Sequence, residues 1–168
     1  MDGRTYDYTE GLTEFYGGEV LGEAFYSALL ETTDDPVERL KLAHLLQLET
    51  ETKAWLRPHL ISAGVSLAES VALRERGRAY AQAQPSAWSD RMKGLADGIE
   101  TVFAALYGRY GDAARIRGRA DEAAVCDFMV EHEMAQVEFA RRDLAGEPLA
   151  RVLAPLRGHS QHLLPLTP

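Results

Sequence analysis

Long helical segments with recognisable ends account for most of this sequence. Apolar residues recur at intervals of three and four, which is the period of a helix with one buried face. This pattern predicts long helices over about 10–31, 35–57, 85–110 or slightly beyond, and 119–145, and no segment shows the alternation typical of a strand. The sequence therefore predicts an all-α fold.

The expected helix ends carry specific signals. Asp35 followed by Pro36 and Glu38 is typical of a helix start, with an N-cap, a proline in the first turn and an acidic residue at the third position. Pro58 is expected to limit the second helix. Gly146 is a plausible C-terminal stop for the fourth.

Loop lengths predict the topology. The first and second helices have a short connection, as do the third and fourth, so each pair should form an antiparallel hairpin. Between the pairs lies a long crossover, 58–87, in which Ser66 and Glu69 form a capping pair for a shorter helix ending near Ala83. The prediction is two antiparallel hairpins joined by a helical crossover.

Length and charge limit the possible classes of protein. The 168 residues fit one domain, 1–168, with a core bundle over about 10–145 and a tail, 146–168, that holds a short helix near 149–156. The net charge of −8 argues against nucleic-acid binding. There is no run long enough to span a bilayer and no signal-peptide core, and a lone Cys126 is compatible with a reducing cytoplasm, where we expect the protein.

Two glutamates occupy positions where a helix in a bundle would normally have leucine. Glu19 and Glu49 lie in the middle of the apolar stripes of the first and second helices. Buried charge is costly unless it is paired, protonated or bound to metal. The stripe of the fourth helix also contains His132 and Gln136, with Glu133 at its edge. These positions predict a polar cluster inside the bundle.

The first helix is apolar on its other side as well, at Leu21, Phe25 and Ala28. A helix that is apolar on both sides is buried on both. The second side predicts either a dimer interface or cover from the crossover and the tail, and we expect a homodimer.

Four histidines lie outside the apolar stripes. His44 is on the outer face of the second helix and His59 lies just past its expected end. His159 and His162 have helical spacing but fall in the proline-rich tail. All four are expected at the surface.

Residues 11–145 resemble the ferritin-like superfamily, the fold of rubrerythrins and di-iron carboxylate proteins. Glu19 with Tyr26 seven residues later is similar to the signature of that family's first helix. Its chemistry needs a glutamate from each of two helices and an E-x-x-H motif from each of the other two. The segments 48–52 and 131–136 occupy the places of the two E-x-x-H motifs, and Glu100 is the best match for the glutamate of the third helix.

The resemblance implies a metal centre with candidate ligands Glu19, Glu49, Glu100, Glu133, Gln136 and His132. Thr52 and Gln136 stand where the family has histidines. Without these two histidines the site has mostly hard oxygen ligands, which favours weaker metal binding or a different metal. His132 is the one imidazole that can substitute, provided that the fourth helix rotates slightly.

Two classes of function follow. The first, implied by the resemblance, is a di-iron-type oxidase or oxygenase with two iron ions, or another divalent metal, and a small hydrophobic substrate. The second is a metal-free bundle acting in self-association or in binding a partner or ligand. There, Glu19 and Glu49 would be compensated by protons, by Lys53 four residues after Glu49, or by hydrogen bonds from Tyr16 and Tyr26.

Overall fold

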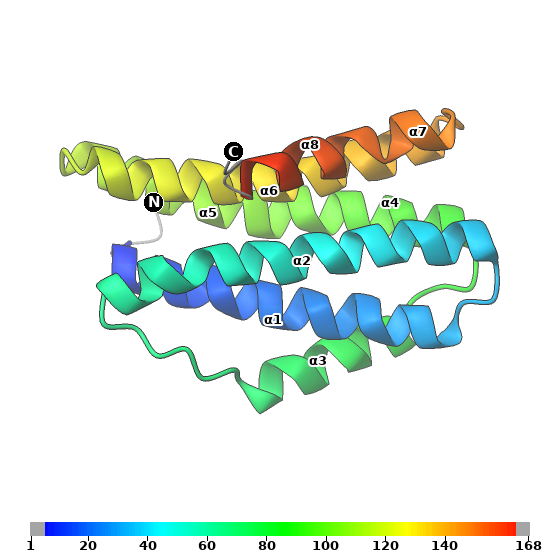
Figure 1. Cartoon of the computed structure of the whole chain (residues 1–168), viewed down its shortest axis with the longest axis horizontal. Coiled ribbons are helices and arrows are strands. Elements are labelled where there is room, and N and C mark those ends of the chain that lie inside the picture. Colours follow the sequence, from blue (N-terminus) through cyan, green and yellow to red (C-terminus); the bar gives the residue numbers. More distant parts are fainter. Residues whose placement is uncertain (1–5, 164–168) are drawn as a thin grey trace, which may run out of the picture.

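The computed structural model describes residues 6–163, with side chains to residue 160. All regular elements in this range are helical, which confirms the all-α prediction (Figure 1). None of these helices is long and apolar enough to cross a membrane. The elements are α1 (Tyr8–Thr32), α2 (Pro36–Ser62), α3 (Val71–Gln82), α4 (Trp88–Gly98), the π-helical η1 (Ile99–Ala104), α5 (Ala105–Ile116), α6 (Ala120–Leu144), α7 (Leu149–Val152) and α8 (Ala154–Leu163).

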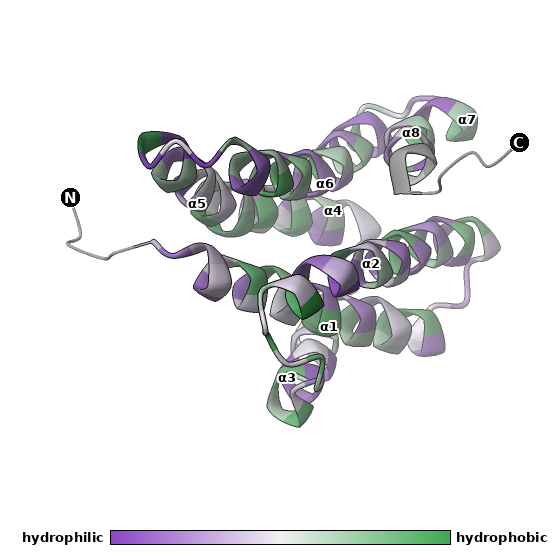
Figure 2. Ribbon diagram, turned by 60° about the vertical axis from the view of Figure 1, so that its left-hand side comes forward, coloured by the Kyte–Doolittle hydropathy of each residue, from purple (hydrophilic) through white to green (hydrophobic). Residues whose placement is uncertain are grey.

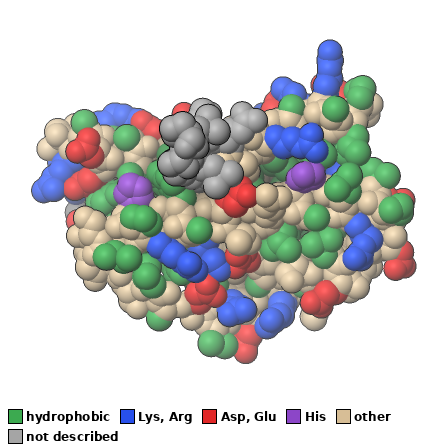
Figure 3. Space-filling view, in the orientation of Figure 1, with side chains coloured by type: hydrophobic (Ala, Val, Ile, Leu, Met, Phe, Trp, Pro, Cys, Tyr) green, Lys and Arg blue, Asp and Glu red, His purple; other side chains and the backbone are tan. Residues whose placement is uncertain are grey.

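The long helices form two layers. In one, α1 and α2 pack side by side, and in the other α6 packs against α4, η1 and α5 (Figures 1 and 2). The crossover helix α3 lies on the outside of α1, and α8 contacts both α6 and α2. On the face shown in Figure 3, basic and acidic side chains are interspersed.

The crossover helix provides the cover that the second apolar side of α1 requires. The backbones approach so closely that a Cβ on Gly77 would lie 2.4 Å from the carbonyl oxygen of Leu21 and 3.1 Å from the amide nitrogen of Phe25. Any side chain at position 77 would separate the two helices. Cover by the crossover, which was one of the two expectations for this side, therefore accounts for it.

The prediction for the start of the second helix is confirmed, and the prediction for its end is wrong. The Asp35 carboxylate accepts hydrogen bonds from the amides of Val37 and Glu38, each at 2.9 Å, as expected for an N-cap. However, α2 continues through Pro58 to Ser62. Proline removes one helical hydrogen bond, but the extra turn buries Leu60 completely in the core, which compensates for that loss.

The crossover helix starts later than the capping pair suggested. Ser70 is the N-cap of α3, and its side chain accepts a hydrogen bond from the amide of Leu73. Ser66 instead accepts one from the amide of Ala68 within the connection. Glu69 is bound to Lys53, so it does not serve as a capping partner.

The third long helix is longer than predicted and is irregular at its centre. It begins at Trp88, and α5 continues to Ile116, six residues past Tyr110, where the sequence predicted an end at that residue or slightly beyond. The π-helical η1 between them is wider than an α-helix, so it changes which residues face the core.

The tail is more ordered than the sequence suggested. Gly146 has a φ of +70°, which fits the predicted helix stop. Beyond it, α8 extends the helical tail to Leu163 and buries Leu156 and His159. The surface prediction for His159 is therefore wrong, because this position shares the apolar face of α8. The His162 side chain lies outside the described residues.

The N-cap of α2 offers a simple test of the fold. Asp35→Ala leaves two amides without their side-chain partner, so we expect a loss of about 1 kcal/mol in the free energy of unfolding. Asp34→Ala is the matched control, because Asp34 is an exposed neighbour outside the cap. Chemical denaturation of both variants measures the difference, and equal stability would contradict this assignment of the cap.

Candidate functional site

A polar layer divides the apolar core at one level of the bundle. Along α1, α2 and α6, one group of buried apolar residues lies on each side of this layer. The layer consists of side chains that are at least nine-tenths buried: Glu19, Glu49, Thr52, Lys53, His132, Glu133 and Gln136. The predicted polar cluster is therefore present.

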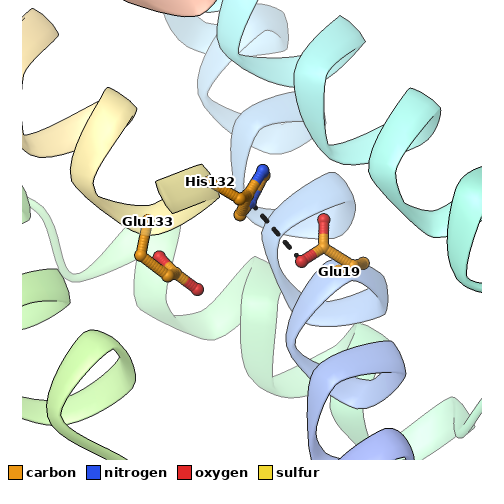
Figure 4. Close-up of side chains that lie close together, drawn as sticks. All are labelled: Glu19, His132 and Glu133. Atoms are coloured by element: carbon orange, nitrogen blue, oxygen red, sulfur yellow. Dashed lines mark ion pairs between the residues drawn. The ribbon is translucent and has the colours of Figure 1, made fainter. Parts of the chain in front are cut away.

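Glu19, His132 and Glu133 form the centre of this layer (Figure 4). Each offers one ligand atom, and these three atoms lie within 4.8 Å of one another. Figure 4 shows Glu19 approaching from α1 and the other two from α6. Side chains of adjacent helix residues usually point in different directions. Here the His132 ring points toward Thr52 of α2, and the Glu133 carboxylate points into the interior of the bundle.

A chain of hydrogen bonds connects the rest of the layer. The Tyr26 hydroxyl donates to Gln136 Oε1 at 2.6 Å, and Gln136 Nε2 donates to Glu49 Oε1 at 2.8 Å. Gln136 Nε2 also lies 3.1 Å from His132 Nε2, and the other ring nitrogen, Nδ1, lies 3.0 Å from Thr52 Oγ1. Tyr26 therefore fixes which end of the Gln136 amide faces the cluster.

This chain determines the tautomer of His132. An amide nitrogen only donates, so the Nε2 that receives its hydrogen bond carries no proton of its own. Nδ1 then carries the proton and donates to Thr52 Oγ1. As a result, Nε2 has no proton to give to Glu19 Oε1 or Glu49 Oε1, each 3.4 Å away. Such an arrangement calls for a proton or a cation between them.

The electrostatics of the layer favour a positive group. Burial raises the pKa of Glu19 well above its ordinary value, and the charges of Glu49 and Glu133 raise it further. The pKa of Glu133 is raised in the same direction, first by burial and then by Glu49. The layer therefore holds protons tightly, or would take up a cation in their place.

Two buried oxygen atoms in this region have no hydrogen-bond partner among the described residues: Glu19 Oε2 in the layer and the hydroxyl of Tyr107. The Tyr107 side chain, on α5, is only 1% exposed, and its hydroxyl points at α1, where a Cβ on Gly18 would lie 2.4 Å away. Unsatisfied buried oxygens are costly, which suggests that something absent from the bare chain satisfies them.

A largely apolar cavity of about 240 Å³ reaches this layer. Its walls come from α1, α3, α4 and η1, and they include Leu21, Phe25, Tyr80, Leu95 and Phe103. The inner end is formed by Glu49, Glu133 and Gln136. Gly22 makes room there, since a Cβ at this position would lie 2.0 Å from Glu49 Oε2.

The structure brings together five of the six predicted ligands: Glu19, Glu49, His132, Glu133 and Gln136. It does not bring Glu100 to them. That side chain is exposed and accepts a hydrogen bond from Arg141 at 2.7 Å. In η1 the inward position belongs to the neighbouring Ile99, so the third helix contributes no carboxylate to the layer.

Lys53, Tyr16 and Tyr26 were expected to compensate Glu19 or Glu49, but each of them bonds to another partner. Lys53 pairs with Glu23 and Glu69 rather than with Glu49. The Tyr16 hydroxyl donates to the carbonyl of Leu67, and that of Tyr26 donates to Gln136, so neither bonds to Glu19. The carboxylates of the layer therefore lack the direct cation that an ion pair would supply.

His159, which was expected at the surface, lies beside this layer. Its ring centroid lies 5.6 Å from that of His132 and 4.5 Å from that of Phe128. The signal for its burial was its spacing from Leu153 and Leu156, which places all three on one face of a helix. Through this contact, α8 covers the outer side of the His132 ring.

Comparison of the chain with models of known protein families gave no match. Comparisons with curated proteins and with solved structures gave none either. The hypotheses about function therefore depend on the geometry of the layer and its cavity.

The raised carboxyl pKa values predict how the metal-free protein responds to pH. Glu19 and Glu133 hold their protons more tightly in the folded than in the unfolded chain. The contribution of these two groups to stability is therefore greatest at low pH and is lost as pH rises from the ordinary carboxyl range through the raised pKa values, by about 1.4 kcal/mol per unit of pKa shift and group. With chelator present, the melting temperature should be lower at about pH 8 than at about pH 6.

Glu19→Gln should weaken this pH dependence, because an amide of the same shape cannot ionise. Glu131→Gln, on the exposed face of α6, should leave it unchanged. Identical pH profiles for the wild type and Glu19→Gln would contradict the assignment.

Proposed function

We propose that this protein is a metal-dependent oxidoreductase built on a ferritin-like four-helix bundle. The observation that carries the proposal is the convergence of three carboxylates and one imidazole in the dry polar layer, at the inner end of an apolar cavity. Four such groups in one place suit a divalent cation. The cavity gives a small molecule access to it.

The arrangement of the helices supports the ferritin-like assignment. Two hairpins, α1–α2 and α4–α6, are joined by a connection that contains α3, as the loop lengths predicted. Glu19, Glu49 and Glu133 occupy the inward positions that the resemblance requires on the first, second and fourth helices. The order and pairing of the helices thus support the assignment, and the three glutamates at these inward positions are the ones proposed to bind metal.

The residues of the layer do not fit the full di-iron set. Glu100 lies outside it, and Thr52 is bound to His132. A bound redox metal would supply Lewis acidity and one-electron chemistry near the cavity. The chain itself supplies the ligands, fixes the His132 tautomer through Gln136 and Thr52, and surrounds the approach to the layer with apolar walls.

The cavity indicates the class of substrate. Its walls are mainly apolar, whereas its inner end carries the Glu49 and Glu133 carboxylates and the Gln136 amide. Such a site accepts a small hydrophobic molecule, with the reacting atom placed next to the layer. Tyr80 of α3 and Gln84, just after this helix, form part of the wall, so the crossover also shapes the site.

Metal binding is the first test of this proposal. Glu19→Ala and Glu49→Ala each remove a ligand oxygen, so both variants should lose bound metal after reconstitution with Fe²⁺ and desalting. Glu51→Ala is the control, because Glu51 lies two residues from Glu49 but is held by Gln47 on the outer side of α2. Equal metal content in all three variants would contradict the site.

One observation favours a second candidate, a metal-free bundle that acts in self-association, for instance as a homodimer, or in ligand binding. Hydrogen bonds from Tyr26 to Gln136 and from Gln136 to Glu49 satisfy part of the polar layer from within the chain. If such bonds and protons suffice, Glu49→Leu should leave the melting temperature unchanged or raise it, because apolar groups can replace a buried polar one without loss. A large drop with chelator present would contradict this candidate.

A further inference from the structure

We propose that the polar layer binds one divalent ion per chain rather than two, and that His132 supplies the imidazole that the E-x-x-H positions lack. This inference rests on the proposed function and specifies the number of metal ions and their ligands. The ligand set is Glu19, His132 and Glu133, with Glu49 as the fourth group. Glutamine and threonine at the two histidine positions then hold the ligands in place and do not bind the ion.

The geometry suits a single ion. Ligand atoms bound at about 2.1 Å from one ion lie at most about 4.2 Å apart. The three ligand atoms of Glu19, His132 and Glu133 lie within 4.8 Å of one another, so small side-chain rotations bring them to bonding distance. Independently, the buried Glu19 Oε2 has no hydrogen-bond partner, so this carboxylate has an oxygen available for the ion.

The tautomer of His132 supports its role as a ligand. Neutral imidazole binds metal through the nitrogen that carries no proton. Here Thr52 Oγ1 faces Nδ1 at 3.0 Å, and Nε2 lies 3.4 Å from Glu19 Oε1. A bound ion would take over the Nε2 lone pair that accepts from Gln136 in the bare chain. Metal-binding histidines usually donate their other N–H to such an oxygen. Thr52 is therefore a positioning residue, although it occupies a position where the family has a ligand.

Among the residues whose side chains the structure describes, 6–160, the layer offers no ligand set for a second ion. In two-metal sites the ions lie about 3.5–4 Å apart, and each needs its own ligands. Gln136 directs its NH₂ group, which cannot bind metal, at Glu49 and His132, while its oxygen accepts from Tyr26. Glu100 is exposed and bound to Arg141. The space beside Glu49 belongs to the cavity instead, where an outside ligand can enter.

The donor set also narrows the choice of metal. Carboxylates suit hard ions such as Mn²⁺, whereas imidazole suits Fe, Zn and Cu. Three carboxylates with one imidazole therefore favour Mn²⁺ or Fe²⁺. Mn²⁺ is the practical probe, because its paramagnetic resonance spectrum distinguishes an isolated ion from a coupled pair.

The test is a titration of the full chain with Mn²⁺, combined with elemental analysis after desalting. We expect one equivalent of tightly bound Mn²⁺ with the spectrum of an isolated ion. Two equivalents with a coupled spectrum would overturn the single-ion inference but leave the proposed function standing. No tight binding of either Mn²⁺ or Fe²⁺ would overturn both.

A pair of variants at Thr52 tests how His132 is held. Thr52→Val keeps the shape of the side chain but removes the oxygen that faces Nδ1, and loss of such a partner lowers metal affinity by about 10–100-fold. Thr52→Ser retains the oxygen and should bind nearly as the wild type does. Melting curves with chelator show whether both variants fold. Wild-type affinity in a folded Thr52→Val protein would overturn the role given to His132.

Discussion

Three glutamates share one dry layer of this protein, and they cannot all carry charge there without a compensating cation. Glu19, Glu49 and Glu133 are each at most 5% exposed, and the nearest ammonium, that of Lys53, binds Glu23 and Glu69 instead. Burial and mutual repulsion raise the pKa of Glu19 and of Glu133. The site therefore requires protons or a metal ion, and the surrounding residues are consistent with either occupant.

The surroundings of the layer relate the fold to the proposed chemistry. Small residues in α1 make space for it, because Gly18 faces the Tyr107 hydroxyl and Gly22 faces the Glu49 carboxylate. The crossover helix α3 covers α1 and completes the wall of the apolar cavity. On the opposite side, α8 places His159 against the ring of His132. The layer is thus closed by the tail and accessible through the cavity.

Much of the fold was predictable from the sequence because helical periodicity and capping are local properties. The start of α2 at Asp35 and the burial of Glu19 and Glu49 followed from the sequence alone. The errors arose where tertiary packing overrides a local signal. The burial of Leu60 carries α2 past Pro58, and the π-helical η1 turns Glu100 to the surface. The spacing also placed His132 in the stripe, but its contact with Thr52 depends on how α2 and α6 pack, which periodicity does not reveal.

In the arrangement that we propose, these carboxylates and one imidazole surround a single cation inside the bundle. An anomalous difference map from crystals grown with Mn²⁺ would show such an ion directly. We expect one peak per chain, within bonding distance of Glu19, His132 and Glu133. The arrangement would be contradicted by a chain that shows no peak there, or by Glu19 and Glu49 side chains that point apart into bulk solvent.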